Sequence, residues 1–286
     1  MNANPSLIHV CAHPDLRAEL SPFGAGLYQL YFKGKKMLYS GEKDEYFHKN
    51  PFFFGQTVAP FAGRIPQGKI GRFSFPLNEG PNCLHSGPFT TAFSLFDYHV
   101  EKGQGKTAVI FHHEQDVEGV HLITETTYEF FEDEPRFSIR IDVTSDQPFP
   151  HSPTHHAYWS LGAKNLGDFE VRMAAHERVR LGEHKEPLGY MDCRDEFDGD
   201  RLKIHQDLDY GYVLDEPKVC YCCNDVCLTA ETNAKVVWIF AGVAGRDPCL
   251  TMEFEQAPLN DDAKLKTGTS SVSATYRLEE TAWKKR

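Results

Sequence analysis

Apolar and polar residues alternate through much of this chain with the period of two that a β-strand requires. Phe137, Ile139, Ile141 and Val143 are separated by single polar residues, which predicts a strand with one buried and one solvent-facing side. Further β-rich runs cover residues 27–32, 69–77, 107–114, 122–131, 169–174 and 235–242, with turn-forming residues between them. No segment longer than about ten residues keeps the apolar spacing of an amphipathic helix. The pattern therefore predicts an all-β fold, a sandwich or a barrel.

Composition narrows the domain organisation and the class of partner. Apolar residues make up 41% of the 286 residues and charged residues 25%, which is typical of a globular chain and not of a disordered one. No linker, repeat or low-complexity tract divides the sequence, so we expect a single domain over residues 1–286. The net charge of −11 is opposite in sign to that of proteins that neutralise phosphate groups, which argues against nucleic acid and anionic membranes as partners. With neither a secretion signal nor a run of about 20 apolar residues, we expect a cytoplasmic protein.

Four of the eight cysteines crowd into the segment VCYCCNDVC, residues 219–227. Zinc sites usually take paired ligands from two separated loops, and the spacing C-x-C-C-x-x-x-C has no second pair downstream. Disulfide frameworks are typical of short secreted chains. We therefore expect Cys220, Cys222, Cys223 and Cys227 to be reduced thiols in neighbouring strands, and whether the cluster has a role stays open.

Two Gly- and Pro-rich segments contain isolated polar side chains. Arg64 lies in the otherwise apolar residues 51–71, where it is either an arginine paired to a carboxylate at a sheet edge or a ligand-binding group. His85 stands beside turn residues in NCLHSGPF, residues 82–89, as a satisfied structural histidine or a functional one.

A third polar segment contains three histidines, His151, His155 and His156, followed by an aromatic pair. On a strand, His156 shares a face with Tyr158, and His155 points to the opposite face. Histidine exchanges protons near neutral pH, and a neighbouring aromatic ring offers an apolar platform for a sugar. Metal binding is disfavoured because His155 and His156 diverge and no carboxylate pattern accompanies them.

A fourth segment, residues 248–262, carries two glutamates at alternate positions. Glu253 and Glu255 project from one face of a strand whose other face holds Leu250, Met252 and Phe254. Two carboxylates on one face form either a solvated surface or the rim of a pocket just ahead of a turn.

Taken together and in order, these segments resemble the aldose 1-epimerases, also called galactose mutarotases. The similar motifs are GRIPQG (63–68) to N-R-I-x-x-G, NCLHSG (82–87) to N-x-L-H-G-G, THHAYWSL (154–161) to T-N-H-S-Y-F-N-L, EPLG (186–189) to I-P-x-G, and DYGYVL (209–214) to D-h-x-F-x-L. The resemblance runs over nearly the whole chain, and it implies a large antiparallel β-supersandwich.

The resemblance also implies roles for five residues. His156 corresponds to the catalytic acid and Glu253 to the base, while Arg64, His85 and Asp209 correspond to residues that hold the substrate. Interconverting two anomers removes a proton from the anomeric hydroxyl and protonates the ring oxygen. We expect a carboxylate and an imidazolium on opposite sides of the anomeric carbon. The reaction needs no metal and no other cofactor, and a small sugar is the expected partner of a monomer or homodimer.

Strand alternation does not choose between the two glutamates, because they face the same way. The family's base stands five residues ahead of a proline, as Glu253 does relative to Pro258, whereas Glu255 stands three ahead. We expect Glu253 to be the deeper carboxylate and Glu255 to lie nearer water with a less perturbed pKa.

Departures from the motifs leave the substrate and the retention of turnover open. Gly63, Ser86 and His155 replace an asparagine, a glycine and an asparagine of the family patterns. One alternative is a hexose-6-phosphate 1-epimerase, for which Lys69 and Arg72 are candidate phosphate ligands. Another is a non-catalytic carbohydrate-binding protein. A glycosidase is disfavoured, because the histidine-led set does not resemble a pair of catalytic carboxylates.

Overall fold

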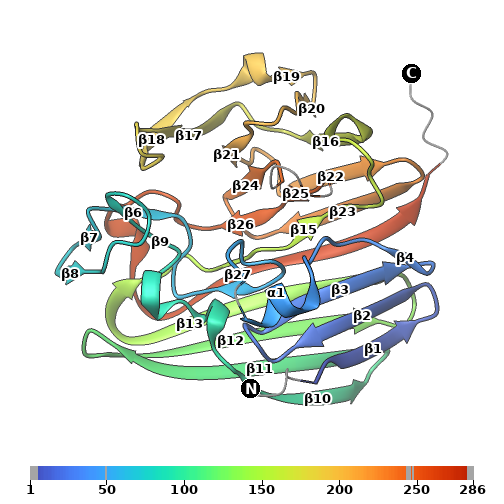
Figure 1. Ribbon diagram of the computed structural model, residues 1–286, viewed down its shortest axis with the longest axis horizontal. Coiled ribbons are helices and arrows are strands. Elements are labelled where there is room, and N and C mark those ends of the chain that lie inside the picture. Colours follow the sequence, from blue (N-terminus) through green and yellow to red (C-terminus); the bar gives the residue numbers. More distant parts are fainter. Residues whose placement is uncertain (1–5, 49, 243–245, 247, 282–286) are drawn as a thin grey trace.

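The computed structural model describes residues 6–48, 50–242, 246 and 248–281. Its largest element is a ten-stranded sheet with antiparallel neighbours throughout (Figure 1). Its strands, in spatial order, are β10 (Asp97–Gly103), β11 (Lys106–Val117), β12 (Val120–Phe131), β13 (Arg136–Pro150), β27 (Leu265–Glu280), β23 (Val226–Thr232), β22 (Lys218–Cys223), β16 (Phe169–Met173), β20 (Arg201–Leu202) and β19 (Phe197–Asp198).

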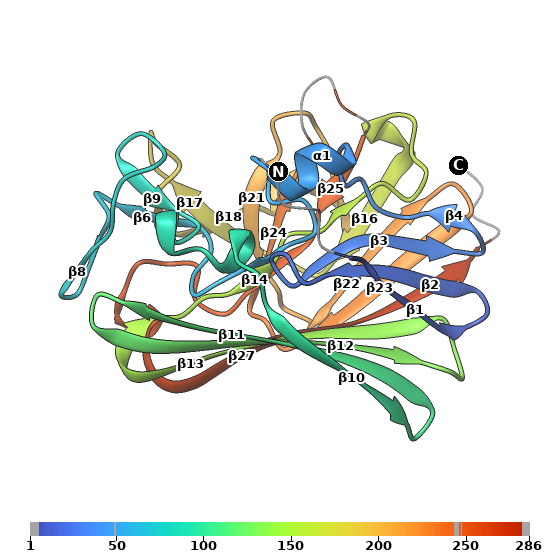
Figure 2. The same ribbon diagram turned by 60° about the horizontal axis from the view of Figure 1, so that its bottom comes forward.

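Two smaller sheets lie against this large one. In Figure 2, β1 to β4 form a layer over the long strands, and β1 packs against β12. The four-stranded sheet is β1 (Ile8–His13), β2 (Leu16–Ser21), β3 (Gly26–Phe32) and β4 (Lys35–Lys36). The five-stranded sheet is, in spatial order, β18 (Pro187–Asp192), β17 (Glu177–Leu181), β21 (Asp209–Val213), β24 (Val236–Phe240) and β26 (Glu253–Glu255).

Four two-stranded pairs and a few short helical segments complete the described chain. The pairs are β14 (Thr154–His155) with β5 (Thr57–Val58), β15 (Tyr158–Trp159) with β25 (Leu250–Thr251), β6 (Arg64–Pro66) with β9 (Asn82–Leu84), and β7 (Lys69–Ile70) with β8 (Phe73–Ser74). The helical segments are α1 (Lys43–His48) and 3-10 turns at Gly87–Phe89, Thr91–Phe93, Leu166–Asp168, Arg194–Glu196 and Asp262–Lys264. Within the described residues, no helix has the length and apolar character needed to cross a membrane.

The predicted all-β, antiparallel architecture is confirmed, and its core follows the alternation of the sequence. Phe137, Ile139 and Ile141 in β13 are all buried. Phe137 stacks on Tyr276 of the neighbouring β27, with ring centroids 4.8 Å apart, and Trp159 packs against Tyr276 from across the core at 5.5 Å. Large aromatic side chains thus fill the space between the sheets and supply much of the apolar area buried there.

Two expectations about local structure are wrong. Residues 69–77 are not one strand: residues 69–74 form the short hairpin β7–β8, because Gly71 adopts a φ of +53° and turns the chain, and residues 75–77 lie outside it. Cys222 and Cys227 were expected to be reduced thiols, but they form a disulfide. The hairpin of β22 and β23 places these two residues directly opposite each other, a cross-strand relationship that cysteine spacing alone does not reveal.

Candidate active site

All five residues to which the motifs assign roles border one cavity of about 320 Å³. Arg64, His85, His156, Asp209 and Glu253 come from segments that span most of the sequence, and the sheets bring them together. The volume is at the lower end of the range of roughly 300–1,000 Å³ found for small-molecule sites. The remaining lining is largely aromatic and charged.

Short strand pairs position the first half of the site. Arg64 is the first residue of β6, and its register partner in β9 is Leu84, so His85 follows directly beside it. His156 lies between β14 and β15, where its backbone N–H donates to the carbonyl of Gln56 at 2.9 Å.

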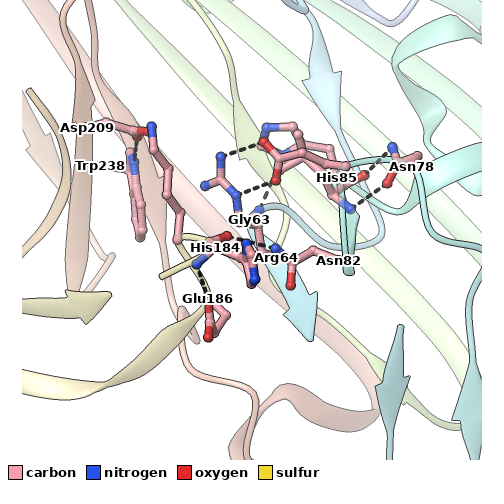
Figure 3. Close-up of polar contacts among 12 residues, drawn as sticks. Gly63, Arg64, Asn78, Asn82, His85, His184, Glu186, Asp209 and Trp238 are labelled. Carbon is pink, nitrogen blue, oxygen red and sulfur yellow. Dashed lines mark hydrogen bonds and ion pairs between the residues drawn. The ribbon is translucent and has the colours of Figure 1, made fainter. Parts of the chain in front are cut away.

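Neighbouring strands of the five-stranded sheet supply the second half. Asp209 is the first residue of β21 and Glu253 the first of β26, and β24 runs between these two strands. Trp238 of β24 is the register partner of Glu253, and its indole N–H donates to Asp209 at 2.7 Å (Figure 3). Trp238 therefore lies between the strands that carry the two carboxylates and fixes one of them.

The side chains of His156 and Glu253 touch. Nε2 of His156 lies 3.4 Å from Oε2 of Glu253, and both residues are buried. Burial lowers the pKa of His156 to about 4 and raises that of Glu253 well above its ordinary value, because a low-dielectric surrounding disfavours both charged forms. The site thus differs in two ways from the expected imidazolium and carboxylate on opposite sides of the anomeric carbon. The two groups lie side by side, and burial favours their neutral forms.

His85 is held in one orientation by the backbone of residue 63. The N–H of Gly63 donates to Nδ1 of His85 at 3.2 Å (Figure 3). Burial lowers the pKa of His85 well below its ordinary value, and the nearby His156 and Arg64 lower it further. A neutral imidazole that accepts at Nδ1 carries its proton on Nε2. His85 is therefore arranged as a hydrogen-bond donor at the cavity.

Both cationic side chains that border the cavity are paired with carboxylates. The guanidinium of Arg64 donates to Glu79 through Nε at 2.5 Å and Nη2 at 2.8 Å. Lys185 donates to Oδ2 of Asp209 at 2.7 Å. Arg64 is thus paired to a carboxylate and also borders the cavity, while its role as a ligand-binding group stays a prediction.

Several cavity residues lie outside the recognised motifs. Lys185 directly precedes the EPLG motif, and Trp238 lies inside the expected strand at 235–242. The sequence patterns cover these segments but assign no role to either residue. Glu79 and Phe53 also border the cavity and lie in loops without a recognised motif. The ring of Phe53 packs against His85 at 4.9 Å, which gives the site an apolar wall.

The expectation that Glu255 lies nearer water than Glu253 is wrong, whereas its pKa is, as expected, less displaced than that of Glu253. Glu255 is as buried as Glu253: Glu255 is 2% exposed and Glu253 is 3% exposed. It also borders the cavity. Burial raises the pKa of Glu255, an effect that the fully buried Lys264 opposes. The carboxylate is enclosed because the segment from β26 to β27 folds back and brings Lys264 close to it.

The three departures from the motifs have different locations. The hydroxyl of Ser86 donates to the carbonyl of Phe61 at 2.7 Å and accepts from its N–H at 3.0 Å, so it fastens a turn. His155 is buried, and its Nε2 lies 2.9 Å from the hydroxyl of Tyr128. Only Gly63 of the three borders the cavity. Lys69 and Arg72 do not border it either, and Arg72 instead donates to Gln147.

Comparisons with known proteins agree with the motif assignment. A sequence model of the aldose 1-epimerase family matches residues 7–241. An aldose 1-epimerase from Streptococcus thermophilus is 27% identical over 157 residues, a segment that covers 51% of this chain and 44% of that relative, so the match spans about half of either length.

Solved structures share the fold over almost the whole chain. Galactose 1-epimerase from Lactobacillus acidophilus superposes with a TM-score of 0.86 at 20% identity, covering 96% of this chain and 94% of that one. An aldose epimerase homologue from C. elegans gives 0.82 at 22% identity, with 96% and 99% covered. A galactose mutarotase-like protein from Clostridium acetobutylicum gives 0.79 at 14% identity, with 98% and 100% covered.

Proposed function

Because the chain belongs to the aldose 1-epimerase family, we propose that it interconverts the α and β anomers of an unphosphorylated aldose. The observation that carries this proposal is the contact of 3.4 Å between His156 and Glu253 in a cavity bordered by Arg64, His85 and Asp209. The anomeric oxygen and the ring oxygen of an aldose are bonded to the same carbon. Two groups that lie side by side can therefore each reach one of these oxygens.

In the proposed reaction, His156 and Glu253 share a single exchangeable proton. Ring opening begins with Glu253 ionised and His156 protonated: Glu253 takes the proton of the anomeric hydroxyl while His156 protonates the ring oxygen, and the bond between the anomeric carbon and the ring oxygen breaks. The aldehyde rotates about its carbon–carbon bond. For closure, the C5 hydroxyl attacks the aldehyde and loses its proton to His156, while Glu253 returns its proton to the carbonyl oxygen.

The protonation of the pair supports this scheme. After ring opening the proton lies on Glu253 and His156 is neutral, which is the distribution that burial of the two groups favours. Internal transfer of one proton across the 3.4 Å contact produces the ionised pair that starts ring opening. The buried site therefore lowers the cost of the open-chain state without any change in net charge.

The charges that border the cavity favour a sugar without a phosphate. Its cations, Arg64 and Lys185, are each engaged by a carboxylate, at 2.5 Å and 2.7 Å. A phosphate dianion would have to displace Glu79 or Asp209 to be neutralised, while facing the additional carboxyl groups of the site. A neutral sugar needs only hydrogen bonds, which these paired groups still offer.

Anomer exchange measured by NMR tests this proposal against its alternatives. We expect exchange of glucose or galactose above the spontaneous rate, and much slower exchange of their 6-phosphates. Faster exchange of the phosphates would favour a hexose-6-phosphate 1-epimerase, and binding without exchange would favour a carbohydrate-binding protein. A cytoplasmic location and a monomeric or dimeric state stay predictions.

A further inference from the structure

Gly63 borders the cavity but is not required there by close packing. A Cβ at this position would meet a single atom within 4 Å, Oε2 of Glu255 at 4.0 Å. By contrast, a Cβ at Gly55 or Gly68 would lie 2.2 Å and 2.1 Å from a backbone oxygen, which no side chain tolerates. The φ of Gly63 is +69°, a conformation that asparagine also adopts, and asparagine is the residue of the family motif. The missing side chain therefore leaves open space in front of Glu255.

The carboxylate of Glu255 has acceptor positions left for hydrogen bonds from that space. The hydroxyl of Ser152 donates to Oε2 at the long distance of 3.4 Å, and a carboxylate offers about four acceptor positions. Lys264 compensates the negative charge electrostatically and is itself held by Oδ1 of Asn260 at 3.4 Å. Asn260 also donates to the carbonyl of Arg64 at 2.7 Å, which connects Lys264 to the segment that contains Gly63.

We propose that Gly63 and Glu255 form a subsite of the sugar pocket, in which the Glu255 carboxylate accepts a hydrogen bond from a hydroxyl or ammonium group of the sugar. The inference rests on the proposed function, because it requires an aldose in the cavity. Glu255 and Glu253 project to the same face of β26 about 7 Å apart along the strand. A sugar whose anomeric hydroxyl contacts Glu253 therefore reaches Glu255 with a group on a different ring carbon. Gly63 provides the room for that group.

Four variants test the subsite. Gly63→Asn fills the space and leaves the Glu255–Lys264 pair intact, while Glu255→Gln removes the charge. Because Glu255→Gln leaves Lys264 buried without its carboxylate, the double variant Glu255→Gln/Lys264→Met keeps the pair neutral if the single variant does not fold. Gly119→Asn is the matched control, since Gly119 lies in the turn between β11 and β12 with a φ of +76°, and a Cβ placed there would have no other atom within 4 Å.

Each protein is measured on glucose, galactose, their monodeoxy forms and the 2-amino-2-deoxy sugars, by anomer exchange and, separately, by the Kd from NMR titration. For the preferred sugar, Gly63→Asn and Glu255→Gln should lower kcat/KM by about 10- to 100-fold, mainly through KM, as expected for a lost hydrogen bond to a charged group. The deoxy form that lacks the contacted hydroxyl should bind the wild type as weakly as it binds the two variants. Its Kd and kcat/KM should therefore not change with either substitution. Tighter binding of an amino sugar would identify ammonium as the preferred donor.

Two results would overturn the subsite: losses of the same size for every sugar, or losses no larger than that of Gly119→Asn. If the wild type exchanges anomers and either result is found, the subsite is wrong and the proposed function stands. If sugars bind with the expected dependence on Gly63 and Glu255 but are not exchanged, the proposed function is wrong and the subsite stands. Absence of both binding and exchange overturns both.

Discussion

His156 and Glu253, almost a hundred residues apart in the sequence, place Nε2 and Oε2 3.4 Å from each other in a buried site. Their pKa values are displaced in opposite directions by the same cause, the loss of water around each charged form. A histidine and a carboxyl group that share one proton in this way can act alternately as acid and base.

The pair should act as a unit. His156→Asn and Glu253→Gln should each lower kcat for anomer exchange by about 10²- to 10⁴-fold. The double variant should be scarcely worse than the worse single variant, because either change already stops the proton exchange. Exchange rates from NMR, with folding verified by circular dichroism, measure this. Independent, multiplicative losses would argue against a shared proton.

The rate of exchange should depend on pH through the same pair. Activity needs the pair to hold one proton, so kcat/KM should fall as the pH drops through the pKa of His156, about 4, where a second proton binds. It should also fall as the pH rises through the elevated pKa of Glu253, where the only proton is lost. His156→Asn should remove the limb near pH 4, and the residual rate should instead rise as Glu253 ionises through its own elevated pKa. Rates corrected for spontaneous mutarotation give the profile, and a limb near pH 4 that persists in His156→Asn would assign it to another group.

His85 should affect binding more than turnover. Its Nδ1 accepts the N–H of Gly63 at 3.2 Å, so Nε2 is available to donate to a substrate, whereas the ring of His156 contacts Glu253. His85→Asn should raise KM by about tenfold, the cost of one hydrogen bond, with a smaller effect on kcat. Steady-state kinetics on the preferred sugar separate the two parameters. A loss in kcat as large as that of His156→Asn would place His85 in the proton transfer itself.

Buried histidines should make the fold sensitive to acid. Burial is the main cause that lowers the pKa of His151 from 6.5 to about 4, and the charge of Lys266 acts in the same direction. The unfolded chain therefore binds more protons between these values, and stability falls as the pH decreases through this window. At pH 5, His151 alone should cost about 2 kcal/mol relative to neutral pH.

The measurement is Tm as a function of pH for His151→Asn and for the exposed control His99→Asn. His151→Asn should reduce the decrease of Tm with falling pH, because up to one proton fewer is taken up on unfolding. His99→Asn should leave this pH dependence of Tm unchanged. His155 acts in the same direction as His151, since burial lowers its pKa to about 3. Glu253 and Glu255 oppose these histidines, because their raised pKa values favour the folded state on acidification. Equal slopes for His151→Asn and the wild type would contradict the prediction.

The Cys222–Cys227 disulfide should add to stability without serving the reaction. It joins residues with a sequence separation of 5, and closing so short a loop restricts the unfolded chain by about 2 kcal/mol. The variant Cys222→Ser/Cys227→Ser should lose about that amount in urea unfolding without a reductant, and should equal the wild type with one. Cys11→Ser, at an exposed cysteine, is the control. Equal stability of the wild type with and without reductant would contradict the prediction.

A chelator provides the corresponding test of the chemistry. The sulfur atoms of Cys220, Cys222 and Cys227 lie within 4.8 Å of one another and resemble a metal-ligand group, but the proposed reaction moves only protons between His156, Glu253 and the sugar. Anomer exchange should therefore survive exhaustive chelation. A loss that zinc restores would assign the cysteine cluster a role in activity.

Local alternation of residues was enough to predict the fold class, and the resemblance to the aldose 1-epimerase motifs pointed to the residues that border the cavity. Alternation over residues 137–143 follows from the period of a strand, so it predicted β13 and its buried face correctly. The motifs around Arg64, His85 and His156 are short and contiguous, and their order along the chain identified residues that meet in one cavity.

Which of these groups are buried, paired or open to a ligand depends on how the sheets pack. Glu255 has the strand pattern of a solvated residue, yet Lys264 and the chain leading to β27 enclose it. The partnership of Lys185 with Asp209, the pairing of Cys222 with Cys227 and the open space at Gly63 depend likewise on strand register and on contacts between distant segments. Periodicity and motif spacing describe one strand at a time. Burial and charge compensation, which set the pKa values and the shape of this site, arise only when the sheets pack together.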